Sequence, residues 1–281
     1  MLETIRRNPA HGLLIFVLAL APLHALAEPM ALPASIQEQV DRGFRDTPML
    51  PGGRWHVHDP DRPQAEVVSP APHPGSAPAD ATVLFDGADL SAFTRADGKP
   101  ADWTIADGVV SPPPRASYAE WSNLKSKEAF GDVQLHLEFR TPFPRATPDG
   151  QMRGNSGVIL MGLYEIQILD SEANHTYADG QASAIYGQMP PLVNASRPAG
   201  EWQSYDIVFE APRFEPSGKL LRPAFVTVLH NGVLTQNHQQ IMGATAWRAL
   251  PEYKAHAEAL PIMLQDHGCA VAFRNIWVRR L

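Results

Sequence analysis

Four side chains in this sequence could exchange protons near neutral pH. His136 and Glu138 lie two residues apart in VQLHLEFR, Glu165 lies in LYEIQILD, and His267 precedes a glycine in LQDHG. Imidazole and carboxyl groups act as general acids and bases when their pKa values lie near the working pH. We take these four as the candidate catalytic residues. We rank Glu165 and His136 first, because rigid strands position a base more accurately than loops do.

Hydrogen-bonding side chains accompany these four residues. Asn155 and Ser156 lie between two glycines in RGNSGVILMG, and glycine allows a backbone to approach a ligand closely. A polar face on a curved sheet suits a carbohydrate, because each sugar hydroxyl needs hydrogen-bond partners. The candidate substrate-binding residues are Arg140, Asn155, Ser156, Gln167, Gln265, Asp266 and Arg274.

The segment EIQILD resembles the E-I-D-I-x-x-E strand of β-glucanase-type glycosidases, which use two carboxylates. Here the central acid is replaced by Gln167, and the second acid would be Asp170. Glu165 and Asp170 are five residues apart, so a regular strand directs them to opposite faces unless a bulge intervenes. The sequence therefore argues against ordinary two-carboxylate glycosidase chemistry.

The strands that position these groups can be predicted from the alternation of apolar and polar residues. Period two predicts a strand over residues 133–140 with one face buried. The residues on that buried face are Val133, Leu135, Leu137 and Phe139. In LYEIQILD, Glu165 and Gln167 share the polar face. If the two polar strands belong to one sheet, Glu138 and Glu165 are expected to open into a common cleft with His136 or His267.

Strand-like runs continue from Ala81 to Leu281, separated by Gly, Asp, Asn and Pro. Asn231-Gly232, between two apolar runs, predicts a tight hairpin because both residues tolerate positive φ. Helical periodicity is weak and confined to residues 246–260. Many short strands in roughly 200 residues predict an all-β antiparallel sandwich of jelly-roll type over residues 81–281.

The N-terminal part of the chain has a different composition. A basic start, an apolar run and Ala25-Leu26-Ala27 predict a signal peptide over residues 1–27, cleaved after Ala27, and hence a periplasmic or secreted protein. Residues 28–80 contain ten prolines and predict an extended Pro-rich segment. Cys269 is the only cysteine, so no intrachain disulfide is expected.

The net charge and the hydropathy pattern argue against some classes of binding partner. The net charge is −7 and there are no basic clusters, which argues against nucleic acid and anionic membrane surfaces. After signal cleavage no further membrane-spanning run is expected. The sequence does not indicate an oligomeric state.

Six motifs, in order, resemble the 3-keto-disaccharide hydrolase domain family, from about Ala81 to Leu281. They are ATVLFDGADLSAF, FGDVQLHLEFR, GNSGVILMGLYEIQILDS, YADGQASAIYGQMPPLVNASRPAGEWQSYDIVFEAPRF, VTVLHNGVLTQN and LPIMLQDHGCAVAFRNIWVR. The resemblance implies a concanavalin A-like jelly roll. It also implies cleavage of 3-keto-glycosides or 3-keto-disaccharides.

The implied reaction differs from ordinary glycoside hydrolysis. A ketone at C3 acidifies the C2 proton, a base removes it, the C1 substituent leaves by elimination, and water can then add. This route needs one base, an acid for the leaving group, and donors for the enolate oxygen. A divalent metal could serve as the electrophile instead, although the sequence shows no clear ligands for one.

A lectin-like carbohydrate-binding module without turnover is the alternative. Both functions need a polar sheet face, but a lectin relies mainly on amides and aromatic rings. A catalyst needs His and Glu residues with shifted pKa values. The four candidate acid–base groups therefore favour an enzyme.

Overall fold

The computed structural model describes residues 44–64, 69, 73–114 and 117–281. Internal contacts divide the chain into a unit up to Glu66 and a second unit from Val67 onward. In the first unit Arg45 forms an ion pair with Asp61, with 2.7 Å between Nη2 and Oδ1. The sheets and cavities discussed below belong to the second unit.

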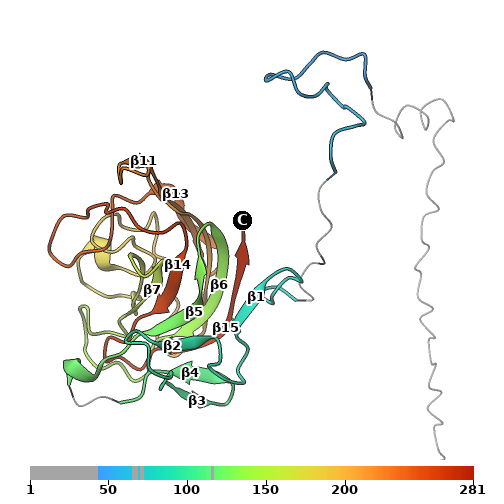
Figure 1. The fold of residues 1–281 in the computed structure, drawn as a ribbon. Coiled ribbons are helices and arrows are strands. Elements are labelled where there is room, and N and C mark those ends of the chain that lie inside the picture. The colour runs from blue at the N-terminus through green and yellow to red at the C-terminus, as the bar shows by residue number, and fades with distance from the viewer. Residues whose placement is uncertain (1–43, 65–68, 70–72, 115–116) are drawn as a thin grey trace, which may run out of the picture. The chain divides into compact units, whose positions relative to one another are not determined.

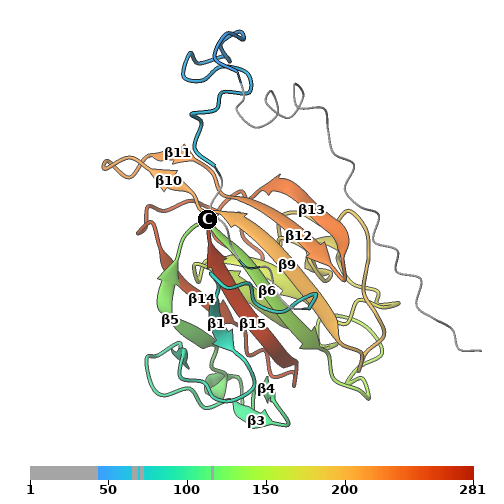
Figure 2. The same ribbon diagram turned by 90° about the vertical axis from the view of Figure 1, so that its right-hand side faces the viewer.

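The larger sheet of the second unit has eight strands, and Figure 2 shows its central strands side by side. Its order across the sheet is β13 (Val233–Gln240), β12 (Phe225–His230), β9 (Gln203–Glu210), β6 (Val133–Arg140), β15 (Ala272–Arg280), β4 (Val109–Ser111) and β3 (Thr104–Ala106). The eighth strand, β1 (Thr82–Phe85), pairs with β15 outside this order.

A five-stranded sheet forms the second layer, which Figure 1 shows beside β6 and β15. Its order is β2 (Phe93–Arg95), β5 (Leu124–Phe130), β14 (Leu260–Leu264), β7 (Ser156–Leu160) and β8 (Tyr164–Ile168). The remaining elements are the hairpin β10 (Arg213–Phe214) and β11 (Leu220–Arg222), and the 3₁₀ turns η1 (Tyr118–Glu120) and η2 (Ala178–Gly180).

The core lies between the two sheets, and β6 contributes to it as the alternation predicts. The inward-facing residues are Val133, Leu135, Leu137 and Phe139, each exposed by 1% or less. From the smaller sheet, Tyr164, Ile166 and Ile168 of β8 join the same cluster. The predicted strand and its register are confirmed. The polar residues of β6 and β8 therefore face away from the core, each on the outer side of its own sheet.

The predicted hairpin is also confirmed. Asn231 and Gly232 link β12 to β13 with φ values of 52° and 78°, and His230 pairs with Val233 across the turn. Positive φ at both positions is the backbone twist that a two-residue hairpin between right-twisted strands requires.

The weak helical signal over residues 246–260 is wrong. Residues 246–251 form a loop that an antiparallel bridge between Ala244 and Glu252 closes at its base, and residues 253–259 continue without a helix to β14. Gly243, at φ 151°, packs so closely on the backbone of Glu252 that a Cβ there would overlap it. Pro251 lies inside the segment and lacks the amide hydrogen that a helix interior needs, so the apolar spacing on its two sides does not form one helix.

Every paired strand in the described residues is antiparallel, and the predicted jelly-roll β-sandwich is confirmed. In the same part of the chain, no helix combines the length and hydropathy needed to cross a bilayer.

Candidate active site

A cavity of about 390 Å³ lies on the outer face of the smaller sheet. Strand β8, the residues just before β7 and the residues just after β14 supply its floor, and the connections that precede β7 and that follow β8 and β13 supply its walls. We call it the inner cavity. The residues that line it are Gln151, Asn155, Glu165, Gln167, Tyr177, Tyr186, Thr245, Trp247, Gln265 and His267.

Glu165 is the one carboxylate among the described lining residues of the inner cavity. Its side chain points there because its neighbours in β8, Tyr164 and Ile166, fill the core. Glu165 is only 6% exposed, and burial raises the pKa of its carboxyl to about 7, although a hydrogen bond from Gln265 opposes the rise. A carboxyl with a pKa near neutrality is suited to act as a general base or acid at physiological pH.

The backbone around Glu165 fixes its position. Its N–H donates to Thr245 Oγ1 at 2.9 Å, which ties β8 to the loop after β13. On the neighbouring strand, a Cβ at Gly157 would overlap the Glu165 carboxylate. Glycine at position 157 therefore leaves the space in which this side chain lies.

A cluster of amides stands beside the carboxyl. Gln167 Nε2 donates to Gln151 Oε1 at 3.1 Å, and Asn155 Nδ2 donates to the same oxygen at 3.3 Å. The Oε1 atoms of Gln167 and Gln265 are buried and lack a hydrogen-bond partner within the described part of the chain. Buried acceptors are costly when unpaired, so these two oxygens suit ligand hydroxyls.

His267 lies at the β14 end of the inner cavity. Its ring packs on Trp121, with 4.8 Å between centroids, and its Nδ1 is buried without a partner among residues 44–64, 69, 73–114 and 117–281. Burial lowers the pKa of the imidazole. His267 is therefore neutral at neutral pH and can accept or relay a proton.

Two phenols complete the wall. Tyr177 and Tyr186 share a hydrogen bond of 2.8 Å between their hydroxyls. Burial, assisted by that bond and by nearby carboxylates including Glu165, raises the pKa of Tyr186. This phenol stays protonated and can donate.

Sequence reasoning did not find Gln151, Tyr177, Tyr186, Thr245 or Trp247. These residues lie on irregular segments, where no periodicity relates one side chain to another. The long connection between β8 and β9 was the available signal, because long structured loops in compact domains are commonly functional.

The other predicted acid–base pair lies elsewhere, on the outer face of the larger sheet. His136 Nδ1 lies 2.7 Å from Asp206 Oδ1, and Glu138 pairs with Arg274 at 2.6 Å. Trp202 packs on the guanidinium group of Arg274, with 4.0 Å from Cζ to the ring centroid. The groups lining this second region include His136, Glu138, Arg197, Trp202, Asp206 and Arg274.

The expected common cleft for Glu138 and Glu165 is therefore wrong. Strand β6 belongs to the larger sheet and β8 to the smaller one, and both polar faces point outward, away from the shared core. Alternation reveals which side of a strand is buried, but it does not reveal which sheet the strand joins. Glu165 and His267 share a cavity with Asn155, Gln167 and Gln265, whereas His136, Glu138, Arg140 and Arg274 lie on the opposite side of the sandwich.

Ser156 and Asp266 lie at the edge of the inner cavity without lining it. Ser156 Oγ donates to the carbonyl of Gln265 at 2.7 Å, and the Asp266 carboxylate accepts from the N–H groups of Ser122 and Gly268 at 3.1 and 3.0 Å. The two side chains hold the backbone that carries Gln265 and His267. Arg140 packs on Trp202 at 4.8 Å.

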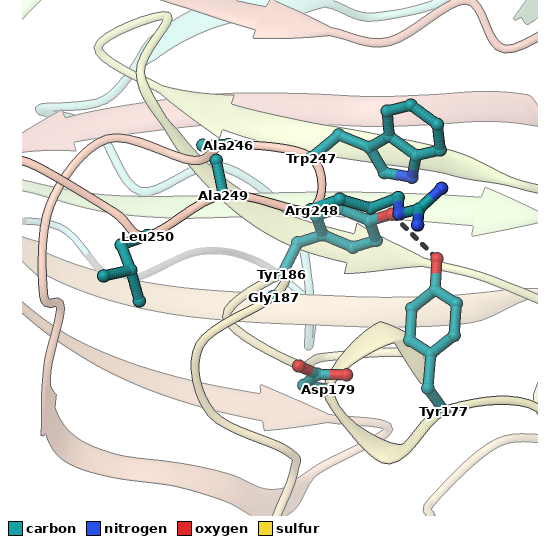
Figure 3. Close-up of a pocket in the computed structure, with 9 residues that line it drawn as sticks. All are labelled: Tyr177, Asp179, Tyr186, Gly187, Ala246, Trp247, Arg248, Ala249 and Leu250. Atoms are coloured by element: carbon teal, nitrogen blue, oxygen red, sulfur yellow. Dashed lines mark hydrogen bonds between the residues drawn. The ribbon is translucent and has the colours of Figure 1, made fainter.

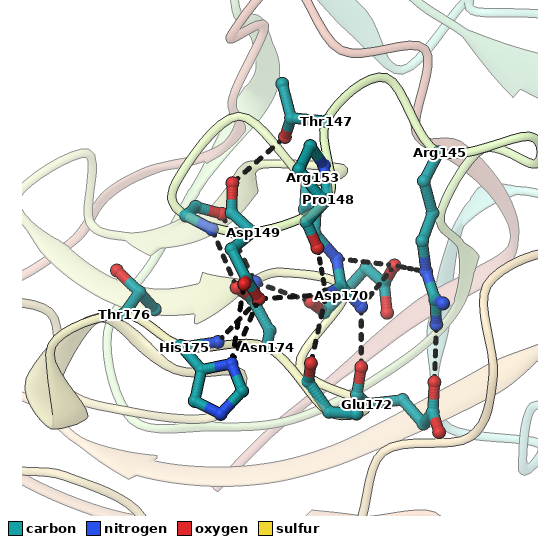
Figure 4. A network of polar contacts seen from close by, with 12 residues as sticks. Arg145, Thr147, Pro148, Asp149, Arg153, Asp170, Glu172, Asn174, His175 and Thr176 are labelled. Carbon is teal, nitrogen blue, oxygen red and sulfur yellow. Dashed lines mark hydrogen bonds and ion pairs between the residues drawn. The ribbon is translucent and has the colours of Figure 1, made fainter.

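Asp170, the second acid of the two-carboxylate alternative, lies in an ion-pair network (Figure 4). Its Oδ2 accepts from Arg145 Nε at 2.6 Å and from Arg153 Nη2 at 3.0 Å. Arg153 is itself buried and bonds the carbonyls of Pro148, Ala173 and Glu172. Asp170 thus anchors the loops beside the inner cavity and is absent from the residues that line it.

The inner cavity offers amides, phenols, one carboxyl and one imidazole. Across the described residues, no three His, Cys, Asp or Glu side chains come together in a way that could hold a metal ion. No ligand set for a divalent metal can be named here.

The comparisons with known proteins indicate a carbohydrate-active protein of the glycosyl-hydrolase type. The chain belongs to the family of the 3-keto-alpha-glucoside-1,2-lyase-like domain, whose model matches residues 80–279. No curated protein matches the chain.

Solved structures agree with this assignment. A candidate glycosyl hydrolase from Parabacteroides distasonis is 41% identical, with a TM-score of 0.73 over 84% of this chain and 100% of its own. Two further candidate glycosyl hydrolases from the same organism share the fold. One is 18% identical, with a TM-score of 0.53 over 72% of this chain and 94% of its own. The other is 22% identical, with a TM-score of 0.51 over 72% of this chain and 99% of its own.

Proposed function

We propose that this protein cleaves the glycosidic bond of a 3-keto-glycoside by removing the proton at C2, with Glu165 as the base. The observation that carries the proposal is the buried carboxyl of Glu165, with a pKa of about 7, in a cavity where the other described lining residues carry no carboxylate. A route through one base fits this site better than a route through two carboxylates.

The reaction divides among the residues of the inner cavity. Glu165 takes the C2 proton, and the electron pair moves toward the C3 oxygen, which the N–H groups of Gln167 and Asn155 can stabilise. The electrons then form the C1–C2 double bond, and the C1–O bond breaks. The departing oxygen takes a proton from Tyr186, whose pKa is raised. Addition of water across the double bond yields the free 3-keto sugar.

The proposal is tested by measuring isotope incorporation into the product with the wild type and with Glu165→Gln. In heavy water the hydrated product of a 3-keto-glycoside is expected to carry deuterium at C2, while the unoxidised glycoside stays intact. Glu165→Gln is expected to lower kcat by about 10²–10⁴, the usual contribution of a general base. Glu138→Gln makes the same chemical change on the other side of the sandwich and should leave kcat near the wild-type value.

Three results would contradict this assignment. Rapid cleavage of the unoxidised glycoside without label at C2 would indicate a different mechanism. Loss of activity in Glu138→Gln but not in Glu165→Gln would move the reaction to the larger sheet. Binding of 3-keto-glycosides without turnover would favour the lectin-like module. Free 3-keto-glucose incubated without enzyme provides the control for spontaneous exchange.

We also propose that the protein is exported by cleavage after Ala27. The support is the sequence pattern of residues 1–27, which lie outside the described residues. Mass spectrometry of the protein purified from the producing cells should find Glu28 at the N-terminus. A mature chain that still begins at Met1 would contradict export by this route.

A further inference from the structure

A second cavity, of about 680 Å³, opens beside the inner one, and we call it the outer cavity (Figure 3). Its lining residues are Tyr177, Asp179, Tyr186, Gly187, Ala246, Trp247, Arg248, Ala249 and Leu250. Tyr177, Tyr186 and Trp247 line both cavities. A ligand whose sugar lies beside Glu165 can therefore extend its C1 substituent into the outer cavity.

The outer cavity presents apolar surface that the described residues leave largely exposed. Trp247 is 72% exposed and Leu250 is 91% exposed, and Ala246 and Ala249 accompany them in the same loop. Arg248 holds its guanidinium 5.4 Å from the centroid of the Trp247 ring. Large apolar side chains gathered at a hollow are a common mark of a binding surface.

The loop that carries Trp247 is fixed at its base. Ala244 N–H donates to Glu252 O at 3.0 Å, and Thr245 N–H donates to Leu163 O at 2.8 Å. Thr245 also accepts from the N–H of Glu165. Trp247 thus lies two residues after Thr245, which contacts the strand that carries the proposed base.

The two cavities differ in what they can recognise. The inner one is lined by four amide side chains, which suit the hydroxyls of a sugar. In the outer one, the hydroxyls of Tyr177 and Tyr186 share one hydrogen bond, which leaves a single phenol proton for a ligand, and Trp247 offers a planar face. Asp179 and Arg248 can bond some hydroxyls of a second sugar ring, but only a ring with an apolar face matches the exposed area of Trp247 and Leu250, and an aromatic ring stacks best on the indole.

We propose that the outer cavity binds the leaving group and that Trp247 selects glycosides with an aromatic aglycone. This assignment rests on the proposed function, because it takes the inner cavity as the site of the 3-keto sugar.

Two substrates that differ only in the leaving group test the preference for an aromatic aglycone. Benzyl and ethyl 3-keto-glucosides release alcohols of similar acidity, so a difference between them reports binding of the ring. Trp247→Ala is expected to lower kcat/KM for the benzyl compound by about three- to tenfold more than for the ethyl compound, the range for an aromatic contact. Trp247→Phe should restore most of the loss. Leu221→Ala, which truncates an exposed apolar residue of β11, is the control.

A binding measurement tests the outer cavity independently of the proposed reaction. In saturation-transfer NMR, the aromatic protons of benzyl alcohol should receive similar saturation from the wild type, Glu165→Gln and Leu221→Ala, and clearly less from Trp247→Ala. An equal loss of rate for both substrates, or benzyl binding that is undiminished in Trp247→Ala, overturns the assignment of the outer cavity. If no 3-keto-glycoside is cleaved but benzyl binding depends on Trp247, the proposed reaction fails and the aromatic site stands.

Discussion

The carboxyl of Glu165 is neutral in the folded protein over a pH range in which an exposed glutamate is charged. Burial raises its pKa from 4.5 to about 7. An unfolded chain releases this proton near pH 4.5 and the folded protein releases it near pH 7, so stability falls as pH rises between these values. The difference corresponds to about 3 kcal/mol. The same shift supplies a base that becomes active near neutrality.

Glu165→Gln is therefore expected to stabilise the fold while it abolishes most activity. Its free energy of unfolding in urea should match that of the wild type at pH 4 and exceed it by about 3 kcal/mol at pH 8. Wild-type kcat/KM should rise with pH through about 7, because the base must lose its proton.

Glu138→Gln is the matched control for this prediction. Glu138 forms an ion pair with Arg274, so its loss should not stabilise the protein at pH 8. Equal stability of Glu165→Gln and the wild type at pH 8 would mean that the Glu165 carboxyl is well solvated.

At the level of elements, the segment of residues 73–80 packs on the outer face of the larger sheet. The carbonyl of Gly75 accepts from Asn275 Nδ2 and from Trp277 Nε1, each at 2.8 Å. A Cβ on Gly75 would lie 3.4 Å from the ring of His136, so the segment lies directly against that imidazole. This contact explains why His136 is only 2% exposed although it faces away from the core.

This packing predicts that residues 73–80 contribute to stability. A chain that begins at residue 73 and one that begins at residue 81 differ only by this segment. The shorter chain should lose about 2 kcal/mol of unfolding free energy, because it leaves the Trp277 N–H and the His136 ring without cover. Trp277→Phe in the longer chain removes one of the two donors and should show a smaller loss. Identical urea midpoints for the two chains would contradict a structural role for the segment.

For the whole molecule, the sequence was sufficient for the antiparallel sandwich. Strand β6 and the Asn231-Gly232 hairpin follow from interactions between near neighbours, which alternation and turn chemistry record. The helical signal over residues 246–260 was wrong because Pro251 interrupts the segment and outweighs its apolar spacing.

The candidate site was predictable only in part, for a physical reason. Glu165, Gln167 and Asn155 lie on adjacent strands near one turn, so sequence proximity brings them together. The separation of Glu138 from Glu165 depends on how strands are shared between two sheets, which is decided by packing across the core. Tyr186 and Trp247 reach the cavity from loops, whose paths are set by tertiary contacts such as the bond between Thr245 and Glu165.

The place of β15 in the larger sheet has a consequence for the order of folding. This strand spans residues 272–280, yet it pairs with β6, β4 and β1 in the interior of the sheet. Strands β6 and β4 each pair with β15, so the sheet stays divided until this strand docks. Contacts of such long sequence separation form slowly. The larger sheet is thus expected to close late in folding, after local hairpins such as β12–β13 have formed.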